Sequence, residues 1–186
     1  MTDTVDLSVL KAVTRAVASS TNPEIMASHM TQLLVGHLGI RGCRIFALNV
    51  TTDELESLAS FGLSITYLNK GPVFSEQSIR ETRQGQTIVI ADVAATDRLQ
   101  YPENAKAEGI GAIVSIPVQV FGKVIGEMRL YTAEAWSPSA PDLEVLALVG
   151  DYLGLALLYA RLFNALEVIN DVVRDVHAVW MGPGNR

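Results

Sequence analysis

Residues 109–131, GIGAIVSIPVQVFGKVIGEMRLY, decide the fold of this chain. Apolar side chains alternate with other side chains on both sides of the turn at Phe121-Gly122-Lys123, and this period of two around a glycine predicts a β-hairpin. Because neither face of the hairpin is fully polar, we expect it to lie in the centre of a sheet. Pro117 has no N–H to donate, so we expect its pairing to be interrupted or bulged. The apolar face is formed by Ala112, Val114, Ile116, Val118, Val120, Val124, Gly126, Met128 and Leu130.

Helices and further strands are expected on the N-terminal side of this hairpin. Asn22 followed by Pro23 and Glu24 is a strong helix start, because asparagine caps, proline fits the first turn and a carboxylate suits the positive end. Asp6 can cap an earlier helix in the same way. We therefore expect helices over 6–19 and 23–38 flanking the sheet, strands over 44–49, 55–60 and 87–90, and short helices over 65–68, over 76–84 after a cap at Ser75, and after Tyr101.

A long C-terminal helix is expected from about Pro141 to Val179 or Trp180, with Ser139 and Asp142 as a variant of the capping box. Its apolar residues recur at alternating spacings of three and four, which predicts a coiled-coil seam. These seam residues are Val145, Leu148, Tyr152, Leu155, Tyr159, Leu162, Leu166, Ile169, Val173, Val176 and Trp180.

A second apolar stripe, made of Leu146, Leu153, Leu157 and Ala160, is confined to the first half of this helix. We expect the first half to pack on the sheet with this stripe and on a partner helix with the seam. The second half, from Leu162 to Trp180, would project and pair with its copy in a homodimer. The alternative is a helix that bends back and buries both stripes within one monomer.

Composition excludes several classes of function. The chain has 186 residues, is 49% hydrophobic, and carries a net charge of −6 without a cluster of Lys or Arg, so we expect no nucleic-acid binding. Cys43 is the single cysteine, which excludes an internal disulfide and a CxxC motif. No run of 18 uninterrupted apolar residues occurs and the start MTDTVDLS is polar, so we expect no membrane association and a cytoplasmic location.

The pattern G-I-x-x-x-x-S-I-P-V-x-x-x-G-x-V-I-G-x-x-x-L, over residues 109–130, resembles the final hairpin of GAF domains. Phe61-Gly62-Leu63 with Leu68, and Asp92-Val93 with Asp97-Arg98, resemble further segments of that family, so that the resemblance covers residues 7–162. It implies an α+β fold: a central antiparallel β-sheet with helices on both sides, GAF-like and profilin-like, plus a long C-terminal helix. It divides the chain into a GAF-like domain, 1–160, and a coiled-coil extension with a short tail, 161–186.

The resemblance implies a sensory or regulatory protein in signal transduction, and not an enzyme. A small effector of unknown identity would bind between the sheet and the segments from about Phe61 to Tyr101. The N- and C-terminal helices would form a dimer that passes the change to a signalling partner. The expected ligand-binding residues are Tyr67, Asp92, Asp97, Tyr101, Ser115, Glu127 and Arg129. Against these roles, Asp92 and Asp97 suit caps of short turns, and Glu127 with Arg129 suits an exposed ion pair.

The sequence contains no constellation that points to catalysis, a metal or a cofactor. His29 and His37 have no acidic residue or cysteine at ligand spacing, and Cys43 is expected to be a buried structural thiol. The GAF types that bind cyclic nucleotides, bind chromophores or reduce free methionine sulfoxide each rely on residues that are missing here. Two alternatives to the sensor remain: a dimerisation or protein-interaction module without a ligand, and, more distantly, a small redox enzyme.

Overall fold

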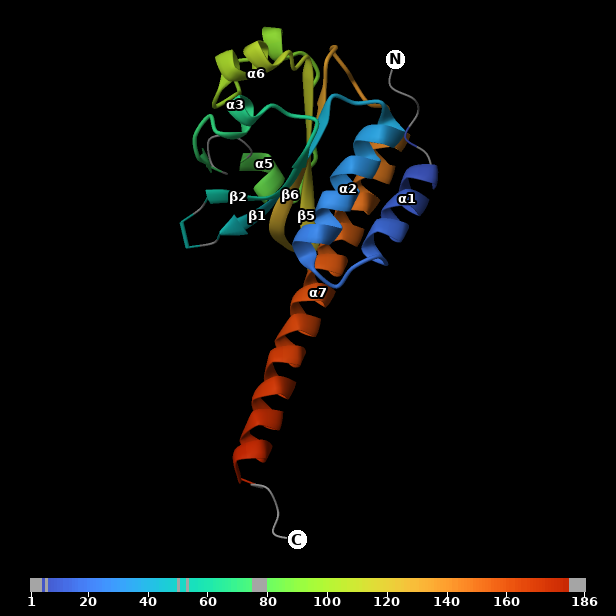
Figure 1. Cartoon of the computed structure of the whole chain (residues 1–186). Helices are drawn as coiled ribbons and strands as arrows, with labels where there is room; N and C mark the ends of the chain where they lie inside the picture. The colour runs from blue at the N-terminus through green and yellow to red at the C-terminus, as the bar shows by residue number, and fades with distance from the viewer. Residues whose placement is uncertain (1–4, 6, 50, 53, 75–79, 181–186) are drawn as a thin grey trace.

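The computed structural model describes the whole chain except residues 1–4, 6, 50, 53, 75–79 and 181–186 and the side chains of residues 7, 74, 80 and 176–180. An antiparallel sheet separates two layers of helices (Figure 1). In chain order the elements are α1 (Leu7–Val17), α2 (Pro23–Leu38), β1 (Gly42–Asn49), β2 (Glu54–Phe61), α3 (Ile65–Leu68), β3 (Val73–Phe74), α5 (Arg80–Arg83), β4 (Ile88–Ile90), the 3-10 turn η1 (Val93–Ala95), α6 (Pro102–Glu108), β5 (Ala112–Val120), β6 (Lys123–Thr132) and α7 (Ala140–Trp180). This is the expected α+β fold.

The sheet has the strand order β3-β2-β1-β6-β5-β4 in the described part of the chain, so the predicted hairpin, β5 and β6, does lie inside the sheet. Its turn is made by Phe121 (φ 51°) and Gly122 (φ 71°), the two positive φ angles of a type I′ turn. The expected irregularity falls one residue late: Pro117 stays opposite Glu127, and the register shifts between Val118 and Gln119.

The apolar face of the sheet is covered by α2 and α7, and α1 packs against these two helices on their outer side, as Figure 1 shows. α7 lies very close to β5, because a Cβ on Gly154 would stand 2.1 Å from the carbonyl oxygen of Gln119, and one on Gly150 would stand 2.6 Å from that of Pro117. Only glycine permits such a close approach. The main core on this side includes Met30, Leu34, Leu38, Ile45, Val114, Ile116, Met128, Leu130, Leu146, Leu153 and Leu157.

The predicted start of α7 is confirmed. Asp142 accepts hydrogen bonds from the backbone N–H of Ser139 (3.0 Å) and from its hydroxyl (2.6 Å), and the N–H of Asp142 points back to that hydroxyl (3.3 Å). Asp142 also accepts from the N–H of Val5 (2.9 Å), which attaches the N-terminal segment to the start of α7. The Ser139 hydroxyl, the leading cause, and these backbone bonds hold the pKa of Asp142 below its usual value.

Other boundaries follow the predictions with small corrections. Asn22 caps α2 through the N–H groups of Glu24 and Ile25 (2.9 and 3.0 Å), and α2 has the predicted bounds. α1 ends at Val17 and not at residue 19, because the Ser19 hydroxyl donates to the carbonyl of Ala16 (2.6 Å) in place of continued helix pairing. β4 is shorter than expected, β3 was missed, and the expected caps Asp6 and Ser75 lie outside the described residues.

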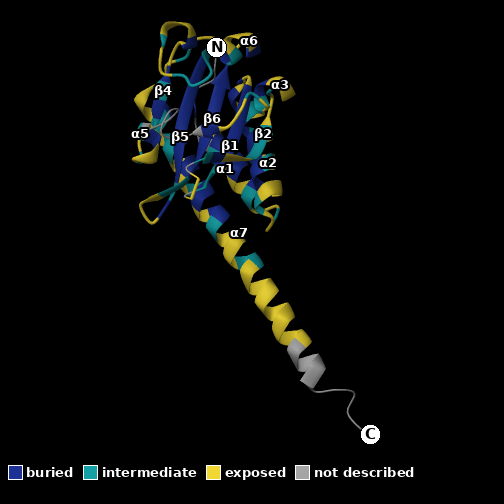
Figure 2. Ribbon diagram, turned by 90° about the vertical axis from the view of Figure 1, so that its left-hand side faces the viewer, coloured by how far each residue is buried: buried dark blue, intermediate teal, exposed yellow. Residues whose placement is uncertain are grey.

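α7 projects far beyond the domain, and its outer half is exposed (Figure 2). The second stripe, Leu146, Leu153, Leu157 and Ala160, is buried on the sheet side, as predicted. The seam is exposed from within the domain outward: Leu148 53%, Leu155 55%, Tyr159 64%, Leu162 55%, Leu166 65%, Ile169 58% and Val173 49%. Val145 and Tyr152 of the seam are half-buried against the core, so the exposed apolar strip becomes continuous only from Leu155 outward, to Val173.

The expectation that no helix could span a membrane needs correction. By length and composition alone, α7 between Ala140 and Asp175 qualifies, with a mean hydropathy of 1.7 in its most apolar window. This segment contains no uninterrupted apolar run of that length, because isolated charges divide it. Within that window 44% of the residues are buried against the domain, which also fits the core helix of a globular domain.

Candidate functional site

The candidate site lies on the face of the sheet opposite α1, α2 and α7. Short segments from α3 to α6 cover this face and enclose a second apolar cluster that includes Phe46, Leu55, Tyr67, Ile113 and Tyr131. Between the cover and the sheet is a cavity of about 20 Å³, enough for about one water molecule. The cavity is lined by Tyr67, Lys70, Val73, Leu99, Gln100, Tyr101, Ala105, Ile113 and Arg129.

The floor of the site is a row of polar side chains across the central strands. Arg44 of β1 lies opposite Arg129 of β6, which lies opposite Ser115 of β5, so these three side chains share one face of the sheet. All three are buried, as is Glu127 two residues before Arg129. Two like charges directly opposite on one face destabilise a sheet unless something compensates them.

Glu127 compensates one of these arginines. Its carboxylate accepts hydrogen bonds from Nε (2.5 Å) and Nη2 (3.3 Å) of Arg129. Burial lowers the pKa of Arg129, but the Glu127 carboxylate outweighs that effect and holds this pKa above its usual value. The two side chains are therefore a buried ion pair, and not the exposed pair that the sequence left open as an alternative.

Arg44 is compensated less completely. Its Nε donates to the hydroxyl of Ser57 (3.0 Å), but its Nη1 has no hydrogen-bond partner among the described residues. Its guanidinium carbon lies 4.5 Å from the centroid of the Phe46 ring, which also faces the guanidinium of Arg129 at 5.2 Å. A cation–π contact contributes roughly 0.5–2 kcal/mol, whereas a buried unpaired ion costs several kcal/mol. The phenyl ring thus offsets only part of the cost of burying Arg44.

The cover supplies a third cation. Nζ of Lys70 lies 3.7 Å from the centroid of the Tyr67 ring and donates to the carbonyl of Tyr67 (3.2 Å). Burial, followed by the charges of Arg44 and Arg129, lowers the pKa of Lys70 to about 7. The charges of Arg44 and Arg129 therefore act on the Lys70 amine from the floor of the site.

Two tyrosines and a carboxylate fix the cover. The Tyr101 hydroxyl donates to the carbonyl of Pro72 (2.7 Å), and Tyr67 packs edge-on against Tyr131 with ring centroids 5.9 Å apart. Glu108 of α6 accepts from the N–H of Ser64 (2.9 Å), from the Ser64 hydroxyl, and from Arg41 at 3.5 Å, which ties α3 to α6.

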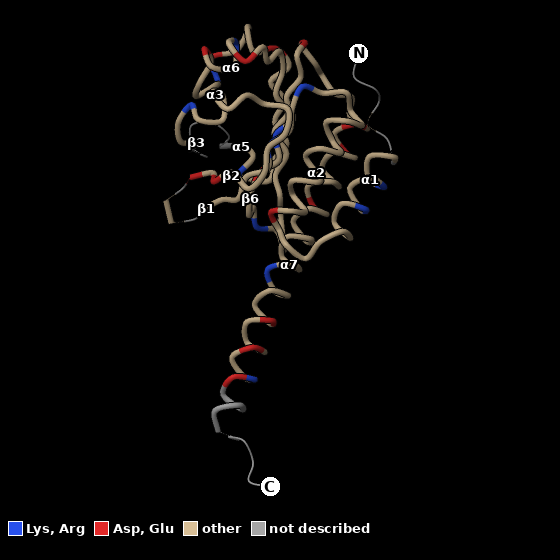
Figure 3. Tube along the Cα trace, viewed as in Figure 1, with Lys and Arg blue, Asp and Glu red and all other residues tan. Residues whose placement is uncertain are grey.

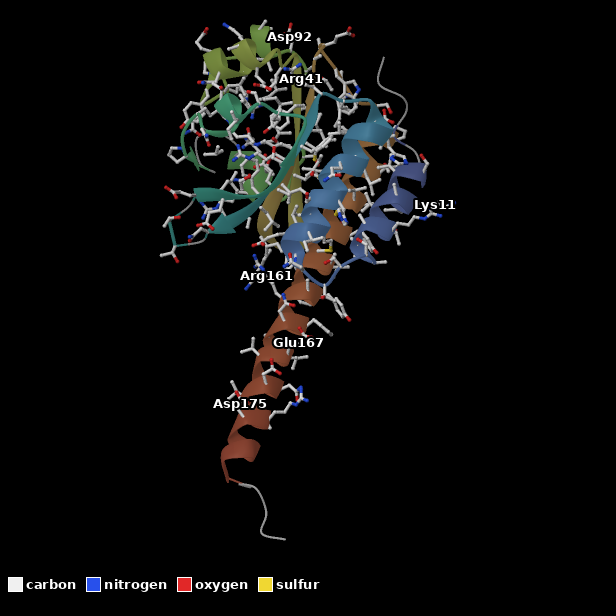
Figure 4. The ribbon with its side chains drawn as sticks, viewed as in Figure 1. Lys11, Arg41, Asp92, Arg161, Glu167 and Asp175 are labelled. Carbon is white, nitrogen blue, oxygen red and sulfur yellow. The ribbon has the colours of Figure 1, made fainter. Side chains whose placement is uncertain are left out.

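An outer hollow of about 370 Å³ lies beside Glu108, Ser64 and Arg41, and Tyr67 lines both this hollow and the inner cavity. Arg41 and Asp92 mark this end of the domain in Figure 4, away from the point where α7 leaves.

The structure brings together five of the seven predicted site residues. Tyr67, Tyr101 and Arg129 line the cavity, and Ser115 and Glu127 lie on its floor beside Arg129.

Asp92 and Asp97 are exposed and do not line the cavity; Asp92 caps η1 through the N–H of Ala94 (2.8 Å). The ligand-binding role of all seven residues stays a prediction.

Three residues of the site were missed from the sequence: Arg44, Lys70 and Tyr131. Arg44 and Tyr131 had a signal, because each lies on the mixed face of a predicted strand, two residues from Phe46 and Arg129 respectively. The hydroxyl of Tyr131 is buried without a hydrogen-bond partner in the described part of the chain. Lys70 gave no signal, because its position depends on the path of the cover.

The helical side of the sheet offers less chemistry. Cys43 is fully buried there, and burial raises the pKa of its thiol. A hollow of about 590 Å³ lies between the α1–α2 connection and α7 and has no charged residue in its lining. Among the described residues, no group of three or more His, Cys, Asp or Glu side chains could hold a metal ion.

The chain resembles known proteins in sequence and fold. The GAF domain family model matches residues 20–158. The GAF domain of a phosphoenolpyruvate-protein phosphotransferase from Coxiella burnetii is 18% identical with a TM-score of 0.74, and the match covers 86% of this chain and 96% of that one. A domain of a sensor histidine kinase protein from Sinorhizobium meliloti is 18% identical with a TM-score of 0.67, over 80% of this chain and 99% of that one.

A free methionine-R-sulfoxide reductase from Neisseria meningitidis, solved with its substrate, is 16% identical with a TM-score of 0.69, and the match covers 82% of this chain and 88% of that one. At these identities the structural matches establish the fold alone. No curated protein matches the sequence. The family model covers most of the chain, and the chain therefore belongs to the GAF domain family.

Proposed function

We propose that this chain is a sensor that binds a small effector on one face of its sheet and transmits binding through a homodimer of α7 helices. GAF domains are typically sensory or regulatory modules of signalling proteins. The observation that carries the proposal is that β5 and β6 contribute side chains both to the candidate site on one face of the sheet and to the core beneath α7 on the other. Ser115 and Arg129 lie on the site side, while Ile116 and Met128, the next residues along the strands, lie in the core beneath α7.

Coupling between the two faces is short-ranged in this arrangement. The Ile116 side chain and the Pro117 carbonyl lie so close to Gly150 that a Cβ there would meet them at 2.9 and 2.6 Å. A shift of β5 cannot be absorbed by loose packing and would move α7. An effector would act by binding one arrangement of the helices more tightly than the other, because equal affinity for both shifts nothing.

The dimer half of the proposal rests on the exposed seam. An apolar strip of this length is unusual on a monomer and has the heptad spacing of a parallel coiled coil. The charged side chains of the described projecting half, Arg161, Glu167, Asp171, Arg174 and Asp175, include both signs, and Figure 3 shows acidic and basic positions along it. A second copy of this chain presents the same strip and would cover it by two-fold symmetry.

Sedimentation of two neighbouring variants tests the dimer. Ile169 (58% exposed) belongs to the seam, and Val168 (63% exposed) does not. Both are exposed, so glutamate at either position should leave the domain folded. We expect Ile169→Glu to dissociate the dimer and Val168→Glu to leave it intact. Equal sedimentation of both variants and the parent would contradict the seam.

A dimerisation module without a ligand is the second candidate. The observation that favours it is the size of the inner cavity, about 20 Å³, which admits no effector unless the cover moves. Native mass spectrometry separates the two candidates, since a sensor should retain or take up a small molecule and the module should not.

We also propose that the chain is not an enzyme: a redox role for Cys43 is disfavoured by its burial on the face opposite the site.

A further inference from the structure

The inner cavity has more positive charge around it than the described carboxylates balance. Lys70 and Arg129 line it, Arg44 lies opposite Arg129 on the same face of the sheet, and Glu127 is already engaged by Arg129. We propose that the cavity binds an oxyanion group, a carboxylate or a phosphate, of the effector. This inference rests on the proposed sensor function and narrows its ligand class.

The donors that would hold the oxyanion come from the sheet. Nη1 of Arg44 and the hydroxyl of Tyr131 are both buried and have no hydrogen-bond partner in the part of the chain that the structure describes. They lie behind the lining of the cavity: Arg44 is opposite Arg129, and Tyr131 packs against Tyr67. Such groups are rare in folded proteins, and a ligand acceptor is one way to satisfy them. Arg44 and Arg129 are paired across β1 and β6 and both face the Phe46 ring, at 4.5 and 5.2 Å from its centroid. An anion bound between the two guanidinium groups would receive hydrogen bonds from both.

Lys70 would close the site from above. Its described contacts are the ring of Tyr67, the carbonyl of Tyr67 and, more distantly, the ring of Tyr101 at 5.8 Å. None of these is a full negative charge. The carboxylate of Glu108 acts on Lys70 only as a weaker influence than the two arginines, and it is engaged by Ser64 and Arg41. A bound anion would therefore add the missing counter-charge.

The dimensions suit an oxyanion at the end of a small molecule. The cavity of about 20 Å³ holds little more than a water, so the carboxylate or phosphate would enter with a small displacement of Tyr67 and Lys70. Tyr67 also lines the outer hollow of about 370 Å³, which has room for the remainder of the effector. Anion binding would thus move α3 directly, because Tyr67 belongs to that helix.

Calorimetric titration of the full chain at constant ionic strength tests the inference. The probes are inorganic phosphate, succinate, and succinamide as the neutral analogue of succinate. We expect at least one anion to bind and succinamide not to bind; which anion binds decides between a phosphate and a carboxylate group. Binding of succinamide as tightly as succinate would overturn the inference.

Two matched variants locate the site. Arg44→Met keeps an unbranched side chain, removes the guanidinium group, and should weaken anion binding by about tenfold or more, the loss expected for a charge-assisted hydrogen bond. Arg15→Met removes the same charge from the exposed side of α1, across the sheet, and should change nothing. Without ligand, Arg44→Met should unfold at the parent's temperature or above, because it removes an uncompensated buried charge. If Arg44→Met does not fold, Lys70→Gln provides the same binding test from the cover.

The outcomes also separate this inference from the sensor function. Should both anions fail while neutral metabolites from a panel bind and are retained in native mass spectrometry, the anion class is wrong and the sensor stands. If no anion and no neutral compound binds, the sensor function fails with it. Anion binding that is unchanged in both Arg44→Met and Lys70→Gln would place the anion elsewhere and refute the assignment.

Discussion

The buried pair of Glu127 and Arg129 gives the sharpest test of the electrostatics of this site. Glu127→Gln preserves the shape of the side chain and removes its charge. Glu127 is 0% exposed and accepts bonds from Arg129 at 2.5 and 3.3 Å, so the change leaves Arg129 buried without this counter-charge and beside Arg44. Breaking one partner of a buried ion pair costs about 3–5 kcal/mol.

An exposed ion pair in the same domain is the matched control. Arg98 and Glu81 approach to 2.6 Å, almost the same distance, but their side chains are 50% and 43% exposed. Glu81→Gln makes the identical chemical change there and should cost no more than about 1 kcal/mol, because solvent screens the pair.

Urea unfolding and thermal melts of the parent and both variants measure the difference. For a chain of this size, 3–5 kcal/mol corresponds to roughly 6–20 °C in Tm, against about 2–4 °C or less for the control. A Glu127→Gln variant as stable as Glu81→Gln would refute the reasoning. It would mean that Arg129 is neutralised by other groups, and the argument for an excess of positive charge would lose its basis.

Three further predictions address other parts of the molecule. Asp142→Asn should cost about 1–2 kcal/mol at neutral pH. Because the folded pKa of Asp142 lies below its unfolded value of 3.8, this stability is present above pH 3.8 and is lost as pH falls through the folded pKa. The urea unfolding curves of parent and variant should therefore converge in acid. Lys70 has a folded pKa of about 7 against an unfolded value of 10.5, so it should react with acetylating reagents near pH 7.5 faster than the exposed amines, as peptide mass spectrometry would show. Its contribution should also make the free energy of unfolding rise between about pH 7 and pH 10.5, since only the unfolded chain binds that proton there. Gly154→Ala should cost about 1–3 kcal/mol, because its Cβ would lie 2.1 Å from a carbonyl oxygen of β5, whereas Gly36→Ala, with no atom within 4 Å, should be neutral or stabilising by up to about 1 kcal/mol in a urea melt.

Local and periodic signals determined a large part of the fold. The alternation around Phe121-Gly122 produced the central hairpin, Asn22 with Pro23 started α2, and Ser139 with Asp142 started α7. Such signals work because a cap or turn needs atoms only a few residues apart, and the backbone carries them together in any context. The two stripes of α7 likewise separated the half that packs on the sheet from the half that projects.

The candidate site could be predicted only in part. Ser115, Glu127 and Arg129 were found because they share the mixed face of one hairpin, which the period of two reveals. Asp92 shows the limit, since one carboxylate in one local pattern can either cap a turn or bind a ligand, and here it caps η1. The length of α7 was also predicted, but the criterion of an uninterrupted apolar run did not reveal its mean hydropathy of 1.7, because isolated charges divide the segment.

By itself, the sequence determined the strands, the helix starts and the faces on which each side chain lies, because these depend on neighbours in the chain. Only the tertiary structure decided that Arg44 stands opposite Arg129, 85 positions along the chain, since strand register between distant segments is set by packing of the whole sheet. It also placed Lys70 above them, because the path of the cover depends on contacts with the sheet and with α6. The charge of the site is therefore a property of the assembled fold, whose three cations come from separate segments of the chain.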